Sequence, residues 1–445
     1  MLLSVFQGRF FVLRCCLLAA TAGLVTIGIL TIYAIGHPKQ VDTNARIQGY
    51  KDTGTPPSIN NQQSSIVHRP SSINKYSNKW KKQLAFAGVG LIGLVLVNLF
   101  HYQRLGSISY LLYGVILAML AMLLVDKMGL ITLPFVHDRL GMHRWIRIGF
   151  GFLVQPSEFC KIAYVLALAW YLRFRSNYRT FVGLVGPFAL TLLAMVLILL
   201  EPDLGTTLLL TPVLFTMLFV AGAKVKHLAI ILCIGLAISP ILWQFMRPYQ
   251  RMRISSVLLQ NKKIMHAAKN NEKLANILVG DPDKLRTWRR AEGYQLLHAK
   301  RAIASGGLAG YGFGKGPYLQ NQKYLKLPEA DNDLIFAMIG HQFGILGCAA
   351  VLLLYILLIA CAVELAWLNT DPFGRLVAVG IAASLAVQVL VNVGMVLGMM
   401  PITGLTLPLI SYGGSSMVAN LIAVGLLNNI GRHRPFSVAK KPFEY

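Results

Sequence analysis

Three carboxylates fall within five residues, at Glu329, Asp331 and Asp333, in a chain with only 17 acidic residues among 445. They stand where a strongly basic segment runs into an apolar one, so Asn332 or Asp333 is placed to cap the helix that follows. Desolvation at such a boundary raises the pKa of a carboxyl group, nearby cations lower it, and either setting suits a general base. The cluster therefore predicts a helix cap, a catalytic carboxylate, or both.

Glu158 and Lys161 form a second group of ionisable residues, three positions apart and therefore on one face of a helix. Pro156 suits the first turn of that helix, and Glu158 suits the positive end of its dipole. Two interpretations stay open: a surface ion pair on a capped helix, or a buried pair at the edge of a bilayer, where ionisable residues indicate function. Asp203, later in the chain, is interpreted first as a helix cap and second as a partner of Lys161.

Two segments rich in glycine interrupt the apolar pattern. Residues 305–316 read SGGLAGYGFGKG, and their backbone N–H groups are able to face an anion. A flexible external loop is the favoured interpretation there, because the Walker spacing is absent. Residues 401–416 read PITGLTLPLISYGGSS, which predicts a broken, re-entrant segment. Non-helical backbone at membrane depth is tolerated only against protein or a water-filled cavity, so we expect a cavity on the outer side.

The elements that must position these residues follow from the composition. The chain is 55% hydrophobic and 13% charged, whereas soluble domains carry about 25% charged residues. Apolar runs of about 20 residues recur, the length that crosses a bilayer as a helix, and they lack the alternation of barrel strands. We predict an all-α, polytopic membrane protein of about ten transmembrane helices. The spans are expected near residues 12–35, 83–101, 107–126, 158–174, 182–200, 204–222, 226–246, 334–367, 374–400 and 408–430.

Basic residues in the short loops place both termini in the cytoplasm. A large extracytoplasmic loop, residues 247–333, then lies between helices 7 and 8, and holds 16 Lys/Arg against seven Asp/Glu. That excess, within a net charge of +25, favours an acidic ligand at the outer membrane face over nucleic acid. Residues 1–36 are the N-terminal end and the first helix, which we expect to be retained as an anchor. Residues 37–82 are a basic linker that we expect to be disordered. The membrane domain covers residues 83–432, and a basic tail covers residues 433–445.

Taken in order, these motifs resemble the SEDS family (shape, elongation, division and sporulation), the group of RodA, FtsW and SpoVE. The resemblance runs from about residue 80 to 432, and it rests on the segments at 144–146, 155–161, 202–206, 293–295, 305–312, 327–337 and 401–416. It implies ten helices and a peptidoglycan glycosyltransferase in the cytoplasmic membrane, with its active site on the extracytoplasmic face. The implied substrate is lipid II, the undecaprenyl-pyrophosphate-linked disaccharide pentapeptide. The implied reaction joins such units into glycan strands with inversion, for elongation or division.

The resemblance also implies roles for single residues. Asp333 matches the family's essential aspartate, which we expect to be the general base that takes the proton from the acceptor hydroxyl. Trp145 matches a functionally important tryptophan near the cavity, and a pyrophosphate leaving group needs cations around it. The residues expected to bind substrate are Arg144, Trp145, Glu158, Lys161, Asp203, Lys300, Arg301, Lys315, Ser411 and Ser415.

The chain departs from the family pattern beside the predicted base. His341 and Gln342 stand where two acidic residues are usual, and Asp331 and Asn332 replace the usual His and Thr. The family implies a class B penicillin-binding protein as partner. No cofactor is predicted, although a divalent cation, Mg²⁺ or Mn²⁺, is able to bridge Asp333 and pyrophosphate. A lipid II flippase and a non-catalytic scaffold of the elongation or division machinery are the alternatives.

Overall fold

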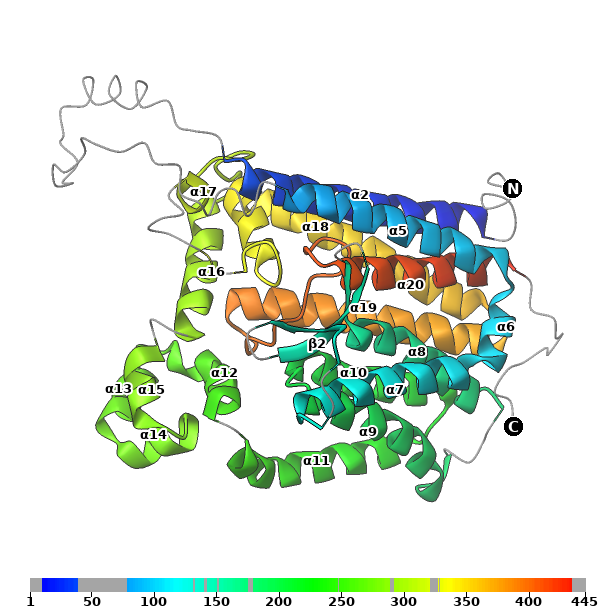
Figure 1. The fold of residues 1–445 in the computed structure, drawn as a ribbon, viewed down its shortest axis with the longest axis horizontal. Coiled ribbons are helices and arrows are strands. Elements are labelled where there is room, and N and C mark those ends of the chain that lie inside the picture. Colours follow the sequence, from blue (N-terminus) through cyan, green and yellow to red (C-terminus); the bar gives the residue numbers. More distant parts are fainter. Residues whose placement is uncertain are drawn as a thin grey trace.

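The computed structural model describes residues 10–38, 78–130, 133–139, 142–149, 152–174, 179–246, 248–288, 292–320, 327 and 329–433. Ten long helices in these ranges lie over the ten predicted spans, which confirms the polytopic helical fold (Figure 1). They are α2 Phe11–Gly36, α5 Lys79–Leu99, α7 Ser109–Lys127, α8 Pro156–Leu172, α9 Val185–Leu200, α10 Leu204–Ala221, α11 Val225–Phe245, α18 Ile335–Leu368, α19 Pro372–Leu397 and α20 Gly414–Arg432.

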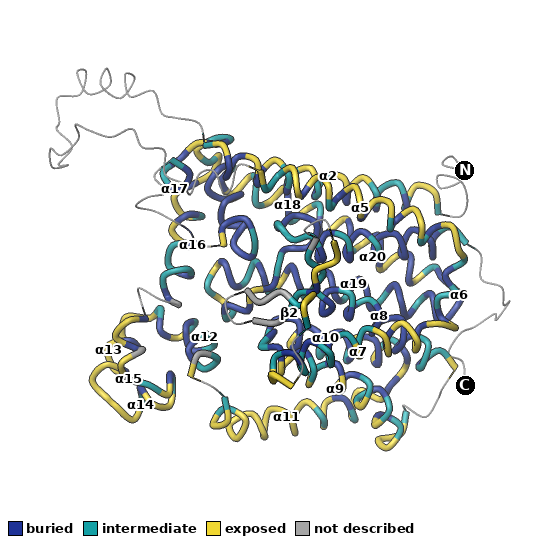
Figure 2. Tube along the Cα trace, viewed as in Figure 1, coloured by how far each residue is buried: buried dark blue, intermediate teal, exposed yellow. Residues whose placement is uncertain are grey.

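Eight of these ten helices, counted over the described ranges, are long and apolar enough to cross a membrane, and α8 and α20 are the two that are not. Both are largely buried in Figure 2, whereas α11 is exposed along most of its length. A helix enclosed by other helices does not need an apolar surface, so it can carry the polar residues of a site. These two largely buried helices are therefore the ones expected to hold functional side chains.

Packing brings together helices that are distant in the chain. α20 lies along α5, α18 packs against both α2 and α19, and α10 packs against α19. Helix α18 has 34 residues and breaks at Gly344, whose φ of 64° and ψ of −159° are not helical. Glycine tolerates positive φ at little steric cost, which is why the helix can break at this residue.

A small antiparallel sheet lies between α7 and α8 in the chain, and the helical prediction did not include it. Its strands, in spatial order, are β1 Val136–Arg139, β2 Met142–Ile148 and β3 Phe152–Val154. Strand β2 contacts α7 and strand β3 contacts α20. The sheet therefore holds the residues next to Trp145 against the membrane helices.

The large loop between the seventh and eighth spans is mostly helical. Its helices are α12 Pro248–Leu259, α13 Lys262–Asn270, α14 Glu272–Leu278, α15 Pro282–Thr287, α16 Glu292–Gly306 and α17 Pro317–Gln320. They gather at one end of the long helices (left in Figure 1), and α16 packs against α18. Trp288, which is 1% exposed, lies in a small apolar core of its own with Met252 and Leu259.

The domain limits proposed from the sequence are partly outside the described residues. Helix α5 begins at Lys79, so the last four positions assigned to the linker are helical. Positions 39–77 of the linker and 434–445 of the tail lie outside the described residues. The disordered linker and the basic tail stay predictions.

Candidate active site

The backbone that carries the predicted base is held at three successive positions. The carbonyl oxygens of residues 331–333 accept hydrogen bonds, in that order, from the Tyr412 N–H at 2.8 Å, the Ser411 hydroxyl at 2.6 Å and the Asn392 amide at 2.8 Å. Two of the donors come from the predicted broken segment and one comes from α19. These three bonds attach the chain entering α18 to the broken segment and to α19.

The side chain of Asp333 has a different environment from its backbone. The residue is 8% exposed, and Oδ1 is buried with no hydrogen-bond partner in the described part of the chain. Burial raises its pKa to about 7, and the charges of Glu329 and Asp331 add to that rise. A backbone hydrogen bond of Asp333 itself and the charge of Arg253 oppose it. Helix α18 has Leu334 as its N-cap and no side-chain cap, so the prediction that Asn332 or Asp333 caps it is wrong. The carboxyl group is therefore available for other chemistry.

Asn392 joins the two non-helical segments at this site. It is fully buried, and its amide donates to the Asp333 carbonyl at 2.8 Å and to the Leu405 carbonyl at 2.7 Å. Ser411 also accepts from the Leu407 N–H at 2.8 Å, so this predicted substrate ligand is bonded within the chain. Residues 401–413 are not helical, and α20 begins only at Gly414, which confirms the predicted break. Sequence reasoning did not single out Asn392, which lies in an apolar helix.

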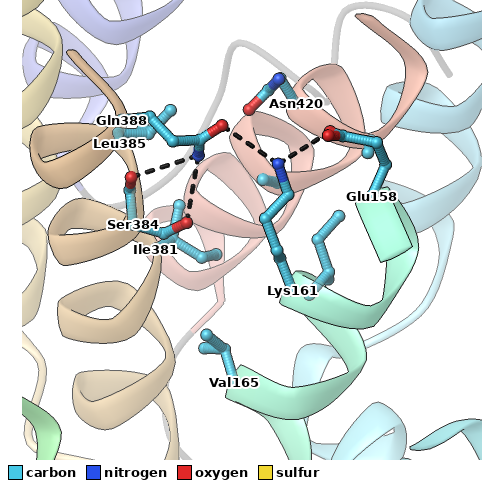
Figure 3. A pocket seen from close by; sticks show the side chains of 11 residues that line it. Glu158, Lys161, Val165, Ile381, Ser384, Leu385, Gln388 and Asn420 are labelled. Carbon is cyan, nitrogen blue, oxygen red and sulfur yellow. Dashed lines mark hydrogen bonds and ion pairs between the residues drawn. The ribbon is translucent and has the colours of Figure 1, made fainter. Parts of the chain in front are cut away.

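The Glu158–Lys161 pair is buried, which decides between the two interpretations left open above. Its Nζ to Oε2 distance is 2.8 Å, and the side chains are 8% and 6% exposed. Lys161 also donates to the side-chain oxygen Oε1 of Gln388 at 3.1 Å, and these groups converge in Figure 3. They line a cavity of about 20 Å³ between α8, α19 and α20, with Ser384 and Asn420. Most of the lining is apolar, but the polar groups named here face a space large enough for one water molecule.

Asp203 caps α10, as the favoured interpretation predicted. Its Oδ1 accepts from the Thr206 N–H at 3.2 Å, and its Oδ2 accepts from the Ser157 hydroxyl at 3.1 Å. Ser415, on α20, accepts from the Gln155 N–H at 2.8 Å. These bonds join the start of α8 to the starts of α10 and α20. Asp203 and Ser415 thus help to set the position of the helix that carries Glu158 and Lys161.

Arg144 and Trp145 are neighbours on strand β2. The Arg144 guanidinium donates to the backbone carbonyls of Glu201, at 2.6 Å, and of Pro202. It therefore ties the sheet to the turn between α9 and α10, and these contacts are with the chain itself. Trp145 is half-buried and pairs with His137 across the sheet.

Glu201 is a buried carboxyl group that sequence reasoning did not select. It is 1% exposed, and Oε1 has no hydrogen-bond partner in the described ranges. Burial raises its pKa to about 8, the Asp203 charge adds to that rise, and Arg144 and Lys127 oppose it. Its position beside Pro202 was visible in the sequence, but its burial depends on the packing of the sheet.

The glycine-rich segment is ordered against α18, so neither interpretation of it is right. The N–H groups of Tyr311 and Gly312 donate to the carbonyls of His341 and Gln342, at 3.2 and 2.8 Å. The Gly314 N–H donates to the Gln342 side-chain oxygen at 3.1 Å. These N–H groups are therefore used within the protein and do not form an anion cradle.

His341 and Gln342, the departures from the family pattern, hold this segment in place. Both are fully buried. His341 Nε2 accepts from the Tyr318 N–H at 3.4 Å, which leaves the proton on Nδ1 for the Ser305 hydroxyl at 2.9 Å. His341 and Gln342 thus contribute neutral hydrogen bonds at the positions where the family pattern has two acidic residues.

The other predicted cations lie on the surface of the helical loop region. Lys300 and Arg301 are exposed on α16, and Lys300 donates to the Gln260 side-chain oxygen at 2.9 Å. Lys315 is exposed in the glycine-rich segment. Within the described ranges, no group of three His, Cys, Asp or Glu side chains is arranged to hold a metal ion. Arg253 on α12 is the cation whose charge acts on Asp333, and sequence reasoning did not select it.

Comparisons with known proteins agree over most of the chain. A family model described as a cell cycle protein of the FtsW, RodA and SpoVE group matches residues 59–435. Stage V sporulation protein E of Bacillus subtilis (strain 168) is 33% identical over 357 residues, which are 79% of this chain and 87% of that protein. The probable peptidoglycan glycosyltransferase FtsW of the same strain is 32% identical over 390 residues, 86% and 88% of the two chains.

A solved structure shows the same likeness in three dimensions. It concerns the structural coordination of polymerization and crosslinking by a peptidoglycan synthase complex. One of its chains is 27% identical to this one and superposes with a TM-score of 0.66, covering 95% of this chain and 98% of that one.

Proposed function

This chain belongs to the family of FtsW, RodA and SpoVE, and on that premise we propose that it polymerises lipid II into glycan strands at the outer face of the cytoplasmic membrane. Peptidoglycan glycosyltransferase activity is supported by the names of its relatives. The observation that carries the assignment to this site is Asp333, a buried carboxyl with an unpartnered oxygen on a backbone held at three positions. Such preorganisation is what a catalytic base requires.

In the proposed reaction, Asp333 accepts the proton of the acceptor sugar hydroxyl. The hydroxyl oxygen attacks the anomeric carbon of the donor, and the bond from that carbon to the pyrophosphate oxygen breaks. The electron pair leaves with the lipid pyrophosphate, and attack on the opposite face inverts the anomeric centre. A base whose pKa lies near 7 combines a useful ionised fraction with a useful driving force for proton transfer.

The leaving pyrophosphate needs positive charge around it. Arg253 acts electrostatically on Asp333, so we assign it to this role ahead of the exposed Lys300, Arg301 and Lys315. Arg144 binds the turn between α9 and α10, and we assign it to positioning the sheet that carries Trp145. We also expect a penicillin-binding protein of class B as partner, which the likeness to a chain of a peptidoglycan synthase complex supports.

The experiment compares the wild type with Asp333→Ala, each given lipid II alone and with a candidate transpeptidase, and detects glycan polymer on a gel. Asp283→Ala is the matched control, because that carboxylate is exposed on α15. We expect polymer from the wild type and the control and none from Asp333→Ala.

Other outcomes point to the alternatives. Polymer from Asp333→Ala would remove the base assignment. A folded wild type that makes no polymer but moves labelled lipid II across proteoliposomes would indicate a flippase. Full complementation of a deletion strain by Asp333→Ala would indicate a scaffold.

A further inference from the structure

Asp331, two residues before the proposed base, forms a buried ion pair with Lys79. Lys79 is the first residue of α5, and 252 positions separate the two in the chain. The side chains are 20% exposed for Lys79 and 2% exposed for Asp331. Lys79 Nζ also lies 5.1 Å from the ring centroid of Tyr412, whose N–H donates to the Asp331 carbonyl. The start of α5, the segment of the base and the broken segment therefore meet at this pair.

The charge of Asp331 bears directly on the proposed base. The pKa of Asp333 is raised first by its own burial and then by Glu329. A backbone hydrogen bond of Asp333 itself and Arg253 from α12 lower it, and Asp331 raises it further. Helix α19 contributes the uncharged Asn392, and the broken segment contributes Tyr412 beside Lys79. Lys79 acts on this set through its contact with Asp331. Without that cation, the charges of Glu329 and Asp331 would act on Asp333 together, against Arg253 and the backbone hydrogen bond of Asp333 itself.

We propose that Lys79 is a positioning residue, which pairs with Asp331 so that the adjacent Asp333 remains usable as a base near neutral pH. The inference rests on the proposed function. The chain holds an acidic residue two positions before the base, and the cation that balances it comes from the distant helix α5. Because the Asp331 carboxylate is 2% exposed, water cannot screen its charge as it would at the surface.

Removing the cation of this pair and removing its carboxylate should move the acidic limb of the pH–rate profile in opposite directions. The limb reports the pKa of the base that must be deprotonated. Lys79→Met leaves the Asp331 charge unbalanced, which disfavours ionised Asp333 and moves the limb to higher pH. Asp331→Asn removes a like charge and moves the limb to lower pH. A change of about one pH unit in each direction is the size expected of one nearby charge.

The test measures initial rates of glycan formation from lipid II by the full chain in proteoliposomes, from mildly acidic to mildly alkaline pH. A transpeptidase partner is included throughout if the wild type requires one. The variants are Lys79→Met, Asp331→Asn and the double variant, whose limb should return close to that of the wild type. Lys79→Arg keeps the cation and should retain the wild-type limb. Lys82→Met, at an exposed position one turn along α5, is the control for loss of a lysine.

A loss of rate with an unmoved limb, or a shift in the same direction for both single variants, would overturn the proposal. If Lys79→Met does not fold, Asp331→Asn and the double variant test the proposal. An unmoved limb in Asp331→Asn is then enough to reject the proposed role of Lys79. Asp333→Asn, measured beside them, distinguishes failure of the proposed function from failure of the role proposed for Lys79. Activity in Asp333→Asn with a wild-type profile contradicts the proposed function, whereas its inactivity without opposite shifts contradicts only the role of Lys79.

Discussion

Asp333 and Glu201 are both buried carboxyl groups with an unpartnered oxygen, but their neighbours differ. The backbone carbonyl of Asp333 accepts a bond from Asn392, and Asp331 and Arg253 act on its charge from two sides. Glu201 lies in a tight turn whose carbonyl is bonded by Arg144. At this scale, burial sets most of the cost of the ionised carboxylate, and the neighbouring charges then raise or lower that cost.

The burial of Glu201 predicts a loss of stability as the pH rises. Its pKa is raised from an ordinary value of 4.5 to about 8, so the folded state keeps the proton where the unfolded state has lost it. The stability that this proton contributes is complete below pH 4.5 and is lost as the pH rises through about 8. Across this window the free energy of unfolding falls by on the order of 1 kcal/mol per pH unit. Glu201→Gln should therefore unfold at a higher temperature than the wild type, with a difference that grows across this window.

The measurement is the thermal unfolding midpoint in detergent micelles over a pH series. Glu272→Gln is the control, because Glu272 is exposed on α14. A constant difference between Glu201→Gln and the wild type at all pH values would contradict the buried, protonated state of Glu201.

At the scale of elements, the site depends on irregular backbone held by regular helices. Asn392 of α19 donates to the carbonyls of Asp333 and Leu405, which belong to two different non-helical segments. The glycine-rich segment follows the same principle, because its N–H groups pair with carbonyls of α18 next to the break at Gly344. Gly306 and Gly310 permit the close approach of two backbones there, whereas Gly307 is a glycine with positive φ in open space.

This reasoning predicts that two neighbouring glycines respond differently to alanine. Gly307 has a φ of 57° and open space around its missing Cβ, so Gly307→Ala should cost about 1–2 kcal/mol of stability. Gly310 has a φ of 76°, and a Cβ there would overlap the backbone of Gln342. Gly310→Ala should therefore cost at least about 3 kcal/mol, since the conformational and packing penalties add. Unfolding midpoints of the two variants, compared in one detergent, give the ranking, and equal midpoints would refute it.

At the scale of the whole molecule, the proposed activity requires one orientation in the membrane. α11 has 21 residues, or about 31 Å of helix, so it places its two ends on opposite sides of a bilayer. Lys226 lies at its start, and the helical loop region with Lys269 follows its end. All six cysteines lie within helices α2, α8, α11 and α18. The parent chain can thus serve as the blank for labelling of new cysteines.

We expect a membrane-impermeant maleimide to label Lys269→Cys in intact cells. Lys226→Cys should be labelled only after permeabilisation, because the proposed topology places it in the cytoplasm. The reverse pattern would put Asp333 on the cytoplasmic side, and the proposed polymerisation at the outer face would then be wrong.

The sequence by itself determined the features that depend on residues close together in the chain. Apolar runs predicted all ten long helices, and local cap chemistry predicted the start of α8 at Pro156 and the cap of α10 by Asp203. The non-helical stretch before α20 followed from its glycines and prolines. The motifs also indicated the family, because their order and spacing can be read directly from the linear sequence.

Only the tertiary structure decided which distant residues meet. Lys79 and Asp331 are 252 positions apart, Asn392 reaches Asp333 over 59, and Arg144 reaches Glu201 over 57. The same packing buried the Glu158–Lys161 pair, turned the glycine-rich segment against α18 and left Asp333 without a cap role. Charge, burial and hydrogen bonding act through space, so the electrostatic environment of the proposed base followed from the fold and not from the motif that contains it.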